Sequence, residues 1–148
     1  MKTANSAGEQ PIGKNIGTNK QTGDFGERPI SKNIGTNKQT GDFGERLAVK
    51  FLSGKGYTIL ETKFRTRAGE IDIIARDNDC IVFVEVKLRK GISMGYPLEA
   101  VGYRKQQKIR KTALYYMTLR NITTDMRFDV IEIIGVDNMT VEHIENAF

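Results

Sequence analysis

The 148-residue chain has one cysteine, one histidine, no tryptophan and three prolines. A single cysteine, Cys80, excludes an internal disulfide and a cysteine-based zinc site, and we expect it to be a buried small hydrophobic residue. His143 lacks a second histidine and a nearby acidic pattern, which predicts a surface strand residue rather than a metal ligand or catalytic base. No apolar run approaches the roughly 18 residues that span a bilayer, and no signal-peptide core begins the chain, so we expect a cytoplasmic protein.

The amino-terminal region contains a tandem duplication. Pro11–Arg28 recurs as Pro29–Arg46, with Gly13 replaced by Ser31 as the one change. The first copy runs into a proline, whereas the second continues into the apolar helical pattern of residues 47–52, so we interpret the second copy as native-like. Because these segments are rich in Gly, Asn, Thr and Lys, we predict a flexible extension over residues 1–41. A domain-swapped arm or a peptide ligand is the alternative.

The remaining residues, 42–148, predict one compact α/β domain, consistent with 39% hydrophobic residues. A helix is expected from Asp42 or Phe43 to the glycines near residue 54, followed by strands beginning at Tyr57, Glu70 and Ile81. A second helix from Pro97 to about residue 119 and strands over residues 127–134 and 140–144 complete the order. Asp129, inside an apolar strand, is expected to be a packed or capping acid. Residues 89–96 form either a loop or a segment that closes over substrate.

Two β-branched runs, residues 70–75 and 81–87, are separated by a polar break and predict an antiparallel hairpin. If residues 77–80 form the loop, Ile74 faces Phe83, Asp72 faces Glu85 and Glu70 faces Lys87, because paired positions sum to a constant. The opposite face of both strands is then wholly apolar. It consists of Ile71, Ile73, Ala75, Val82, Val84, Val86 and Leu88.

Charged groups inside this sheet indicate a metal site. Two carboxylates directly across a strand pair lie about 5 Å apart at Cβ and repel unless a cation separates them. Oxygen ligands without His or Cys favour Mg²⁺ or Mn²⁺. We predict that Asp72, Glu85 and the Val86 carbonyl hold the metal and that the Lys87 ammonium assists phosphodiester hydrolysis, with Glu70 supporting the metal ligands. The alternative is a Glu70–Lys87 salt bridge with solvated neighbours, which leaves Asp72 facing Glu85 without a neutralising partner.

The Asp–spacer–Glu-x-Lys pattern of Asp72, Glu85 and Lys87 resembles the PD-(D/E)xK nuclease motif, although the Pro-Asp pair is absent. Four ordered blocks also resemble a mostly uncharacterised, endonuclease-like bacterial family that is similar to archaeal Holliday-junction resolvases; they are Gly44–Ala48, Gly69–Ala75, Phe83–Lys87 and Arg127–Glu132. The resemblance covers about residues 42–148. It implies a restriction-endonuclease-like αβββαβ core with a mixed central sheet flanked by helices.

The resemblance also implies an additional catalytic acid and a dimer. A glutamate on the first helix of the resolvases maps by position to Glu45, a residue type that is common on helix surfaces in its own right. Symmetric cutting of two strands implies a two-fold homodimer. A shared fold does not by itself establish nuclease activity, so the acidic residues must support that assignment.

The net charge of +5 and the isoelectric point near 9.3 indicate a nucleic-acid partner, with DNA favoured and RNA left open. Without a base-reading motif, we expect recognition of backbone and shape, and therefore structure-specific cutting. The resemblance to junction resolvases implies branched or junction DNA as the substrate, in repair or recombination. The expected contacts are Lys63, Arg65, Arg67, Arg89, Arg104 and Lys105. A non-catalytic nucleic-acid-binding protein and a structural module whose acids only form ion pairs are the alternatives.

Overall fold

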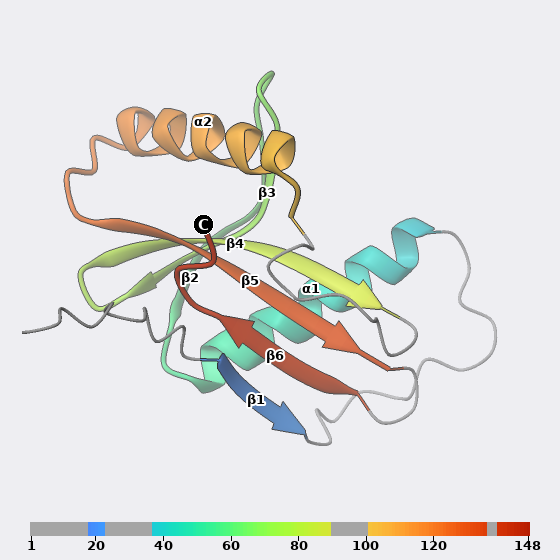
Figure 1. Ribbon diagram of the computed structural model, residues 1–148. Coiled ribbons are helices and arrows are strands. Elements are labelled where there is room, and N and C mark those ends of the chain that lie inside the picture. The colour runs from blue at the N-terminus through green and yellow to red at the C-terminus, as the bar shows by residue number, and fades with distance from the viewer. Residues whose placement is uncertain (1–17, 23–36, 90–100, 136–138) are drawn as a thin grey trace, which may run out of the picture.

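The computed structural model describes residues 18–22, 37–89, 101–135 and 139–148 (Figure 1). These residues form six strands and two helices. In chain order they are β1 (Thr18–Thr22), α1 (Asn37–Gly54), β2 (Thr58–Arg65), β3 (Glu70–Asp77), β4 (Cys80–Arg89), α2 (Tyr103–Leu119), β5 (Met126–Ile134) and β6 (Thr140–Ile144). Within these ranges no helix is long and apolar enough to cross a bilayer.

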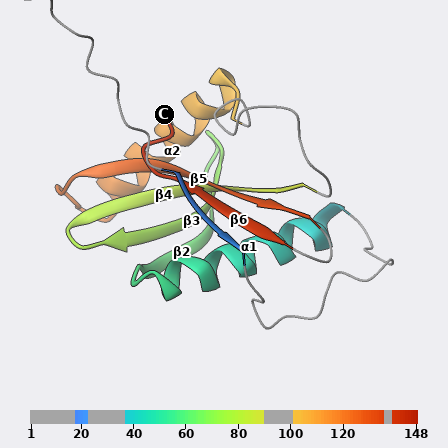
Figure 2. The same ribbon diagram turned by 60° about the horizontal axis from the view of Figure 1, so that its bottom comes forward.

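All six strands form one sheet in the order β1-β6-β5-β4-β3-β2. The β4–β5 pair is parallel and the other pairs are antiparallel, so the sheet is mixed. The α2 helix lies over one face and α1 crosses the other (Figures 1 and 2). The predicted αβββαβ order is therefore confirmed, with β6 and β1 added at one edge.

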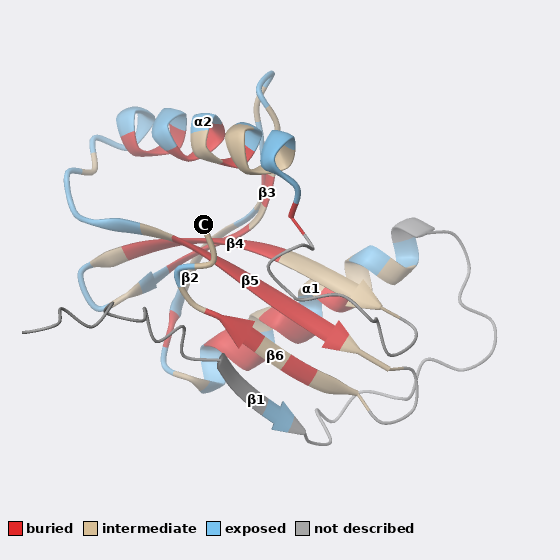
Figure 3. Ribbon diagram, viewed as in Figure 1, coloured by how far each residue is buried: buried red, intermediate tan, exposed pale blue. Residues whose placement is uncertain are grey.

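The sheet is buried on both faces because each helix covers an apolar cluster. Buried residues run through the central strands and the inward sides of both helices (Figure 3). On the α1 side, Leu47, Phe51 and Leu52 pack with strand residues such as Val82 and Ile131. At Gly44 an added Cβ would lie 3.2 Å from Leu88 Cβ, so the absence of a side chain there lets α1 approach β4 closely.

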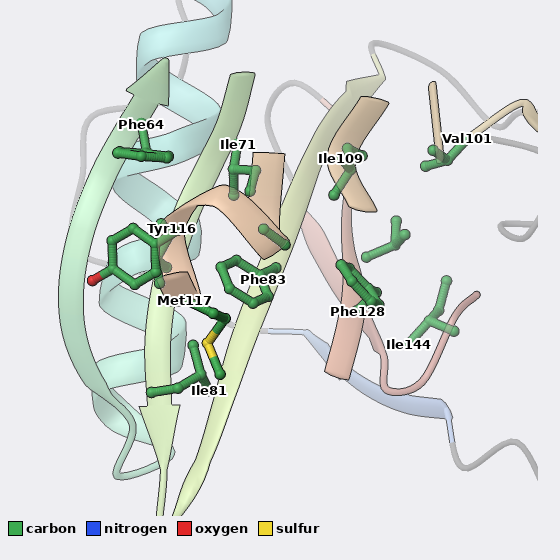
Figure 4. Packing of buried hydrophobic residues seen from close by; sticks show 13 residues of the cluster. Phe64, Ile71, Ile81, Phe83, Val101, Ile109, Tyr116, Met117, Phe128 and Ile144 are labelled. Atoms are coloured by element: carbon green, nitrogen blue, oxygen red, sulfur yellow. The ribbon is translucent and has the colours of Figure 1, made fainter. Parts of the chain in front are cut away.

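The cluster on the α2 side is rich in aromatic rings (Figure 4). The Phe83 ring stacks on Phe128 at 5.7 Å between centroids and meets Tyr116 edge-on at 5.9 Å. Phe148 stacks on Phe128 with 5.3 Å between ring centroids, and the Arg110 guanidinium lies 5.1 Å from the centre of the Phe128 ring. These contacts attach α2 and the final residues to the same part of the sheet.

The predicted hairpin register is confirmed at the turn end. Ile74 pairs with Phe83, and the same register extends to an Asp77–Cys80 pair. The connecting loop is therefore two residues rather than the expected four, with Asn78 at φ 53°. Asparagine tolerates this left-handed backbone conformation better than most residues, which explains why the shorter turn forms.

The prediction that Ile71 lies on the same face of β3 as Ile73 is wrong. Ile71 packs in the α2-side cluster together with Ile74, whereas Ile73 lies in the α1-side cluster. Two residues three positions apart can share a face only if the strand alternation breaks between them. The break falls at Asp72, next to a residue of β2, Lys63, whose φ is 55°. The acidic residue is thus part of a backbone irregularity, not of a regular pleat.

The amino-terminal extension also differs from the prediction. Thr18–Thr22, expected to belong to a flexible segment, pairs with β6 as an edge strand. The α1 helix begins at Asn37, five residues before the expected start at Asp42. The other residues assigned to the extension, 1–17 and 23–36, lie outside the described part of the chain, as do the Pro97 start of the second helix and most of segment 89–96.

Candidate active site

The two predicted metal-binding carboxylates lie where β3 and β4 separate. The ladder between these strands ends at Ile73 and Val84, before the expected Asp72–Glu85 pair. Beyond it, Asp72 Oδ2 accepts the backbone N–H of Val86 at 2.8 Å. The Asp72 side chain therefore takes the place of a backbone acceptor, and it is anchored against β4 one residue beyond Glu85.

Glu85 is buried between two ammonium groups. Its side chain is 3% exposed, and Lys87 Nζ lies 2.8 Å from Oε1. Lys105, on α2, places Nζ 3.1 Å from Oε2, close enough for an ion pair but outside hydrogen-bond geometry. Oε2 is consequently a buried oxygen without a hydrogen bond. The structure thus brings Lys87 and Lys105 to the same carboxylate from two different elements.

Asp72 carries the clearest electrostatic perturbation in the site. Burial, followed by repulsion from Glu85, raises the pKa of Asp72 to about 7. The Val86 N–H and the Lys105 ammonium lower this pKa but do not offset the increase. Asp72 therefore exchanges its proton near neutral pH, chiefly because its carboxyl group is removed from water.

Glu45 reaches the edge of this site from the α1 side. Its direct partner is Lys63, whose Nζ lies 3.4 Å from Glu45 Oε2 and also pairs with Asp42. Burial raises the pKa of Glu45, and the charge of Glu45 adds a small repulsion at Asp72. Glu45 therefore lies close enough to affect the pKa of Asp72, but its own direct contact is with Lys63.

Glu70 and Lys87 do not pair with each other. Arg65 binds Glu70 through two contacts of 3.0 and 3.1 Å, while Lys87 binds Glu85. The salt bridge that offered an alternative to the metal site is thus replaced by two separate ion pairs. Glu70 contributes a further small repulsion at Glu45 rather than a contact with the acid pair.

The six basic residues expected to bind nucleic acid divide into two groups. Four form ion pairs with acids of the site or its surroundings: Lys63, Arg65, Arg89 and Lys105. Arg67 and Arg104 are exposed to solvent. Lys63 takes the left-handed backbone conformation and pairs with Asp42 and Glu45 of α1.

Sequence reasoning missed Glu132 as a site residue. It is 2% exposed, lies opposite Lys87 in the parallel β4–β5 ladder and pairs with Arg89. The sequence places Glu132 in the block Arg127–Glu132. Its neighbours on β4 become known only once the pairing of β4 with β5, strands far apart in the sequence, is known. Glu132 on β5 therefore places a further buried carboxylate beside Lys87 and Arg89 of β4.

His143 is buried, which corrects the expectation of a surface residue. Its Nε2 lies 2.8 Å from Asp129 Oδ2, and its Nδ1 lies 2.9 Å from Lys55 Nζ. An ammonium can only donate, so Nδ1 accepts and the Nε2–H donates to Asp129. Asp129 also accepts from Arg127 Nε and the Asn146 N–H. The prediction that Asp129 is a packed or capping acid is confirmed, and the rings of Phe51 and Tyr57 pack edge-on against His143.

The donor set fits a metal ion in its chemistry. Asp72 and Glu85 are oxygen ligands, and Glu85 Oε2 is a buried oxygen without a hydrogen bond. Across the described ranges, no three side chains of His, Cys, Asp and Glu converge as a metal cage. Only two carboxylates are therefore placed for a cation, a number that suits Mg²⁺, which retains waters and borrows substrate oxygens.

The family comparison covers this whole site. The model of an uncharacterised protein family, UPF0102, matches residues 44–133. UPF0102 proteins from Thermodesulfovibrio yellowstonii, Alkaliphilus oremlandii and Clostridioides difficile are each 50% identical to the chain, over 102, 106 and 103 residues. The matches span 69% of this chain and 88%, 91% and 90% of the respective relatives. These names state no activity.

Proposed function

Because the chain belongs to the uncharacterised family UPF0102, we propose its function from the site itself: metal-dependent, endonuclease-like hydrolysis of DNA phosphodiester bonds. The substrate would be branched or junction DNA in repair or recombination, recognised by structure. The observation that carries the proposal is the Asp72–Glu85 pair, in which burial and then repulsion from Glu85 raise the pKa of Asp72 to about 7. Such a pair favours binding of a cation.

Each residue has a distinct role in this proposal. Asp72 and Glu85, with the Val86 carbonyl, would hold Mg²⁺ or Mn²⁺, which when bound would lower the pKa of a water molecule and neutralise phosphate charge. The Val86 N–H orients Asp72 through its 2.8 Å hydrogen bond. The Lys87 ammonium, 2.8 Å from Glu85, would stabilise negative charge that develops on the phosphate. Glu45 would be an auxiliary acid once Lys63 moves away.

The test is cleavage of labelled four-way-junction, flap, single-stranded and duplex DNA with Mg²⁺, Mn²⁺ or EDTA. Asp72→Asn and Lys87→Ala should abolish products, while Asp79→Asn, an exposed acid in the β3–β4 turn, is the matched control. Products that require metal and persist in Asp79→Asn would support the assignment. Products that survive both Asp72→Asn and Lys87→Ala would refute it.

A non-catalytic nucleic-acid-binding protein is the second candidate. The specific observation in its favour is that Lys87 and Lys105 already contact both Glu85 oxygens, so the two ammonium groups occupy the space beside the carboxylate. This reading predicts salt-sensitive DNA binding that Asp72→Asn leaves unchanged and no product with any metal.

A homodimer is the proposed assembly, since two equivalent cuts on a symmetric junction require two sites. Sedimentation equilibrium with and without junction DNA tests it. A single monomeric species in both conditions would leave each chain to cut one strand and would remove the basis for symmetric resolution.

A further inference from the structure

A second feature of α2 lies away from the acid pair. A cavity of about 430 Å³ opens between the β2–β3 turn and α2. Its lining consists of Arg65, Thr66, Arg67, Ala68, Lys111 and Tyr115. Three of these residues are cationic and none is a carboxylate. The size falls within the range of small-ligand sites, and the charge favours an anion.

One wall of the cavity is an exposed aromatic ring that lies beside a buried one. Tyr115 is 55% exposed, and its ring lies 6.4 Å from that of Phe64 with an angle of 25° between the planes. Phe64 is itself buried and meets Tyr116 edge-on at 5.1 Å. An exposed ring backed by a fixed ring is a ready platform for stacking a planar group.

Hydrogen bonds hold the part of the lining that the β2–β3 turn contributes. Thr66 Oγ1 accepts the backbone N–H groups of Ala68 and Gly69 at 3.1 and 3.3 Å and lies 3.3 Å from Thr112 Oγ1 on α2. At Gly69 an added Cβ would lie 3.2 Å from Lys108 Cβ, so the turn packs directly on the helix. The cavity is therefore formed before any ligand arrives, which lowers the entropic cost of binding.

Its cations differ in how far they are already neutralised. Arg65 is paired with Glu70. Arg67 and Lys111 are exposed, and within the described part of the chain neither has a carboxylate at ion-pair distance. Two unneutralised cations beside a stacking ring match the two parts of a nucleotide, its phosphate and its base.

We propose that this cavity binds one unpaired nucleotide of a single-stranded nucleic acid, with the base stacked on Tyr115 and the phosphate between Arg67 and Lys111. A duplex buries the faces of its bases, so paired DNA cannot supply the stacking partner. The shared chemistry of an unpaired base and a phosphate occurs in both DNA and RNA. The experiment therefore includes both polymers.

The position of the cavity relative to the acid pair indicates which DNA the proposed nuclease would cut. This part of the inference alone rests on the proposed function. Lys105 contacts Glu85, and Tyr115 follows ten residues later on the same helix, a distance of about 15 Å along its axis. An extended strand covers that distance in a few nucleotides. The substrate would thus carry a single-stranded segment beside the scissile bond, as in a flap or a fork.

The experiment measures binding in EDTA, where no cleavage occurs. Fluorescence anisotropy compares the full chain on labelled single-stranded DNA, single-stranded RNA, a hairpin duplex and an abasic single strand of equal length. The variants are Tyr115→Ala, Tyr115→Phe, Lys111→Ala and the control Tyr103→Ala, another exposed tyrosine on α2. Thermal melting of each variant verifies that it is folded.

We expect Tyr115→Ala to weaken binding of base-containing single strands by about fivefold or more, with little change for the abasic strand. Tyr115→Phe retains a stacking ring and should bind like the wild type. Lys111→Ala should weaken all single strands and reduce the salt dependence. A 2-aminopurine base in the strand should lose fluorescence on binding to the wild type and to Tyr115→Phe, and not on binding to Tyr115→Ala.

Equal affinity of the wild type for abasic and base-containing strands would overturn the proposal, as would equal effects of Tyr103→Ala and Tyr115→Ala. Failure of the nuclease assignment leaves these measurements unchanged, because they need no metal and no turnover. Conversely, metal-dependent cleavage without any Tyr115 dependence of binding would remove the nucleotide site and keep the nuclease.

Discussion

Replacing Asp72 by asparagine isolates the charge of the buried acid pair. The asparagine Oδ1 can still accept the Val86 N–H that Asp72 Oδ2 accepts at 2.8 Å, so the geometry between β3 and β4 is retained. The change removes the carboxylate whose pKa is raised to about 7 by burial and then by Glu85. The expected effect is therefore a pH-dependent change in stability.

The sign of the change in stability with pH depends on whether the folded or the unfolded chain binds the Asp72 proton more tightly. The unfolded chain releases the Asp72 proton near pH 3.8, whereas the folded protein keeps it up to about pH 7. The folded state binds more protons in that window, so the stabilisation present below pH 3.8 is lost as the pH rises through 7. A pKa rise from 3.8 to about 7 corresponds to a free energy of about 4 kcal/mol. This figure is an upper bound, because water and Lys105 rearrange around the ionised pair.

The assay is urea unfolding of wild type, Asp72→Asn and the control Asp79→Asn at several pH values between 4 and 8, in EDTA. At pH 8 Asp72→Asn should be more stable than the wild type by up to about 4 kcal/mol, and the difference should shrink toward pH 4. Adding Mg²⁺ at pH 8 should stabilise the wild type and not the variant.

Parallel stability curves for the wild type and Asp72→Asn across this pH range would refute the reasoning. The pKa of Asp72 would then not be raised in the folded protein, and the electrostatic argument for a metal ion at this carboxylate would be lost. An Mg²⁺ effect of equal size in both proteins would locate the cation elsewhere on the molecule.

Three further predictions concern other parts of the structure. Lys105→Met removes an ammonium that lowers the pKa of Asp72, so this pKa should rise above about 7 in a ¹³C NMR titration; an unchanged value contradicts the 3.1 Å contact with the acid pair. His143→Leu leaves Asp129 buried without one of its donors and should cost about 1–3 kcal/mol of unfolding free energy in urea, whereas a neutral result would show that Arg127 and the Asn146 N–H together satisfy it. Deleting residues 11–28 removes β1 and should speed hydrogen exchange of β6 amides; unchanged exchange would mean that β1 does not protect this edge.

The parts of the fold that local patterns encode were predictable. The hairpin register followed from β-branched runs and the polar turn, because side chains alternate strictly along a regular strand. The helix–strand order followed from apolar spacing in the same way. The acid pair was also visible, since Asp72 and Glu85 occupy positions where a buried sheet rarely tolerates charge.

The parts that failed depend on contacts between distant segments. Ile71 lies on the face opposite to the predicted one because the strand alternation breaks at Asp72, beside Lys63 of β2 with its left-handed backbone. Neither Asp72 nor Lys63 alone indicates that break. His143 appeared isolated, yet the sheet places Lys55 and Asp129 on its two ring nitrogens. Neighbours that are many residues apart become visible only when strand order and register are known.

The duplicated segment separates the two kinds of information most clearly. The sequence by itself determined the apolar runs, the strand and helix order, and the acids that lie near one another at Asp72 and Glu85. It did not determine the conformation of Asn-Lys-Gln-Thr, which is strand at residues 19–22 and helix at residues 37–40. Intrinsic preferences of these residues are too weak to choose between the two conformations. The β6 edge supplies backbone partners for the first copy, while the helix anchored by Leu47 and Phe51 extends through the second, so the tertiary structure decides.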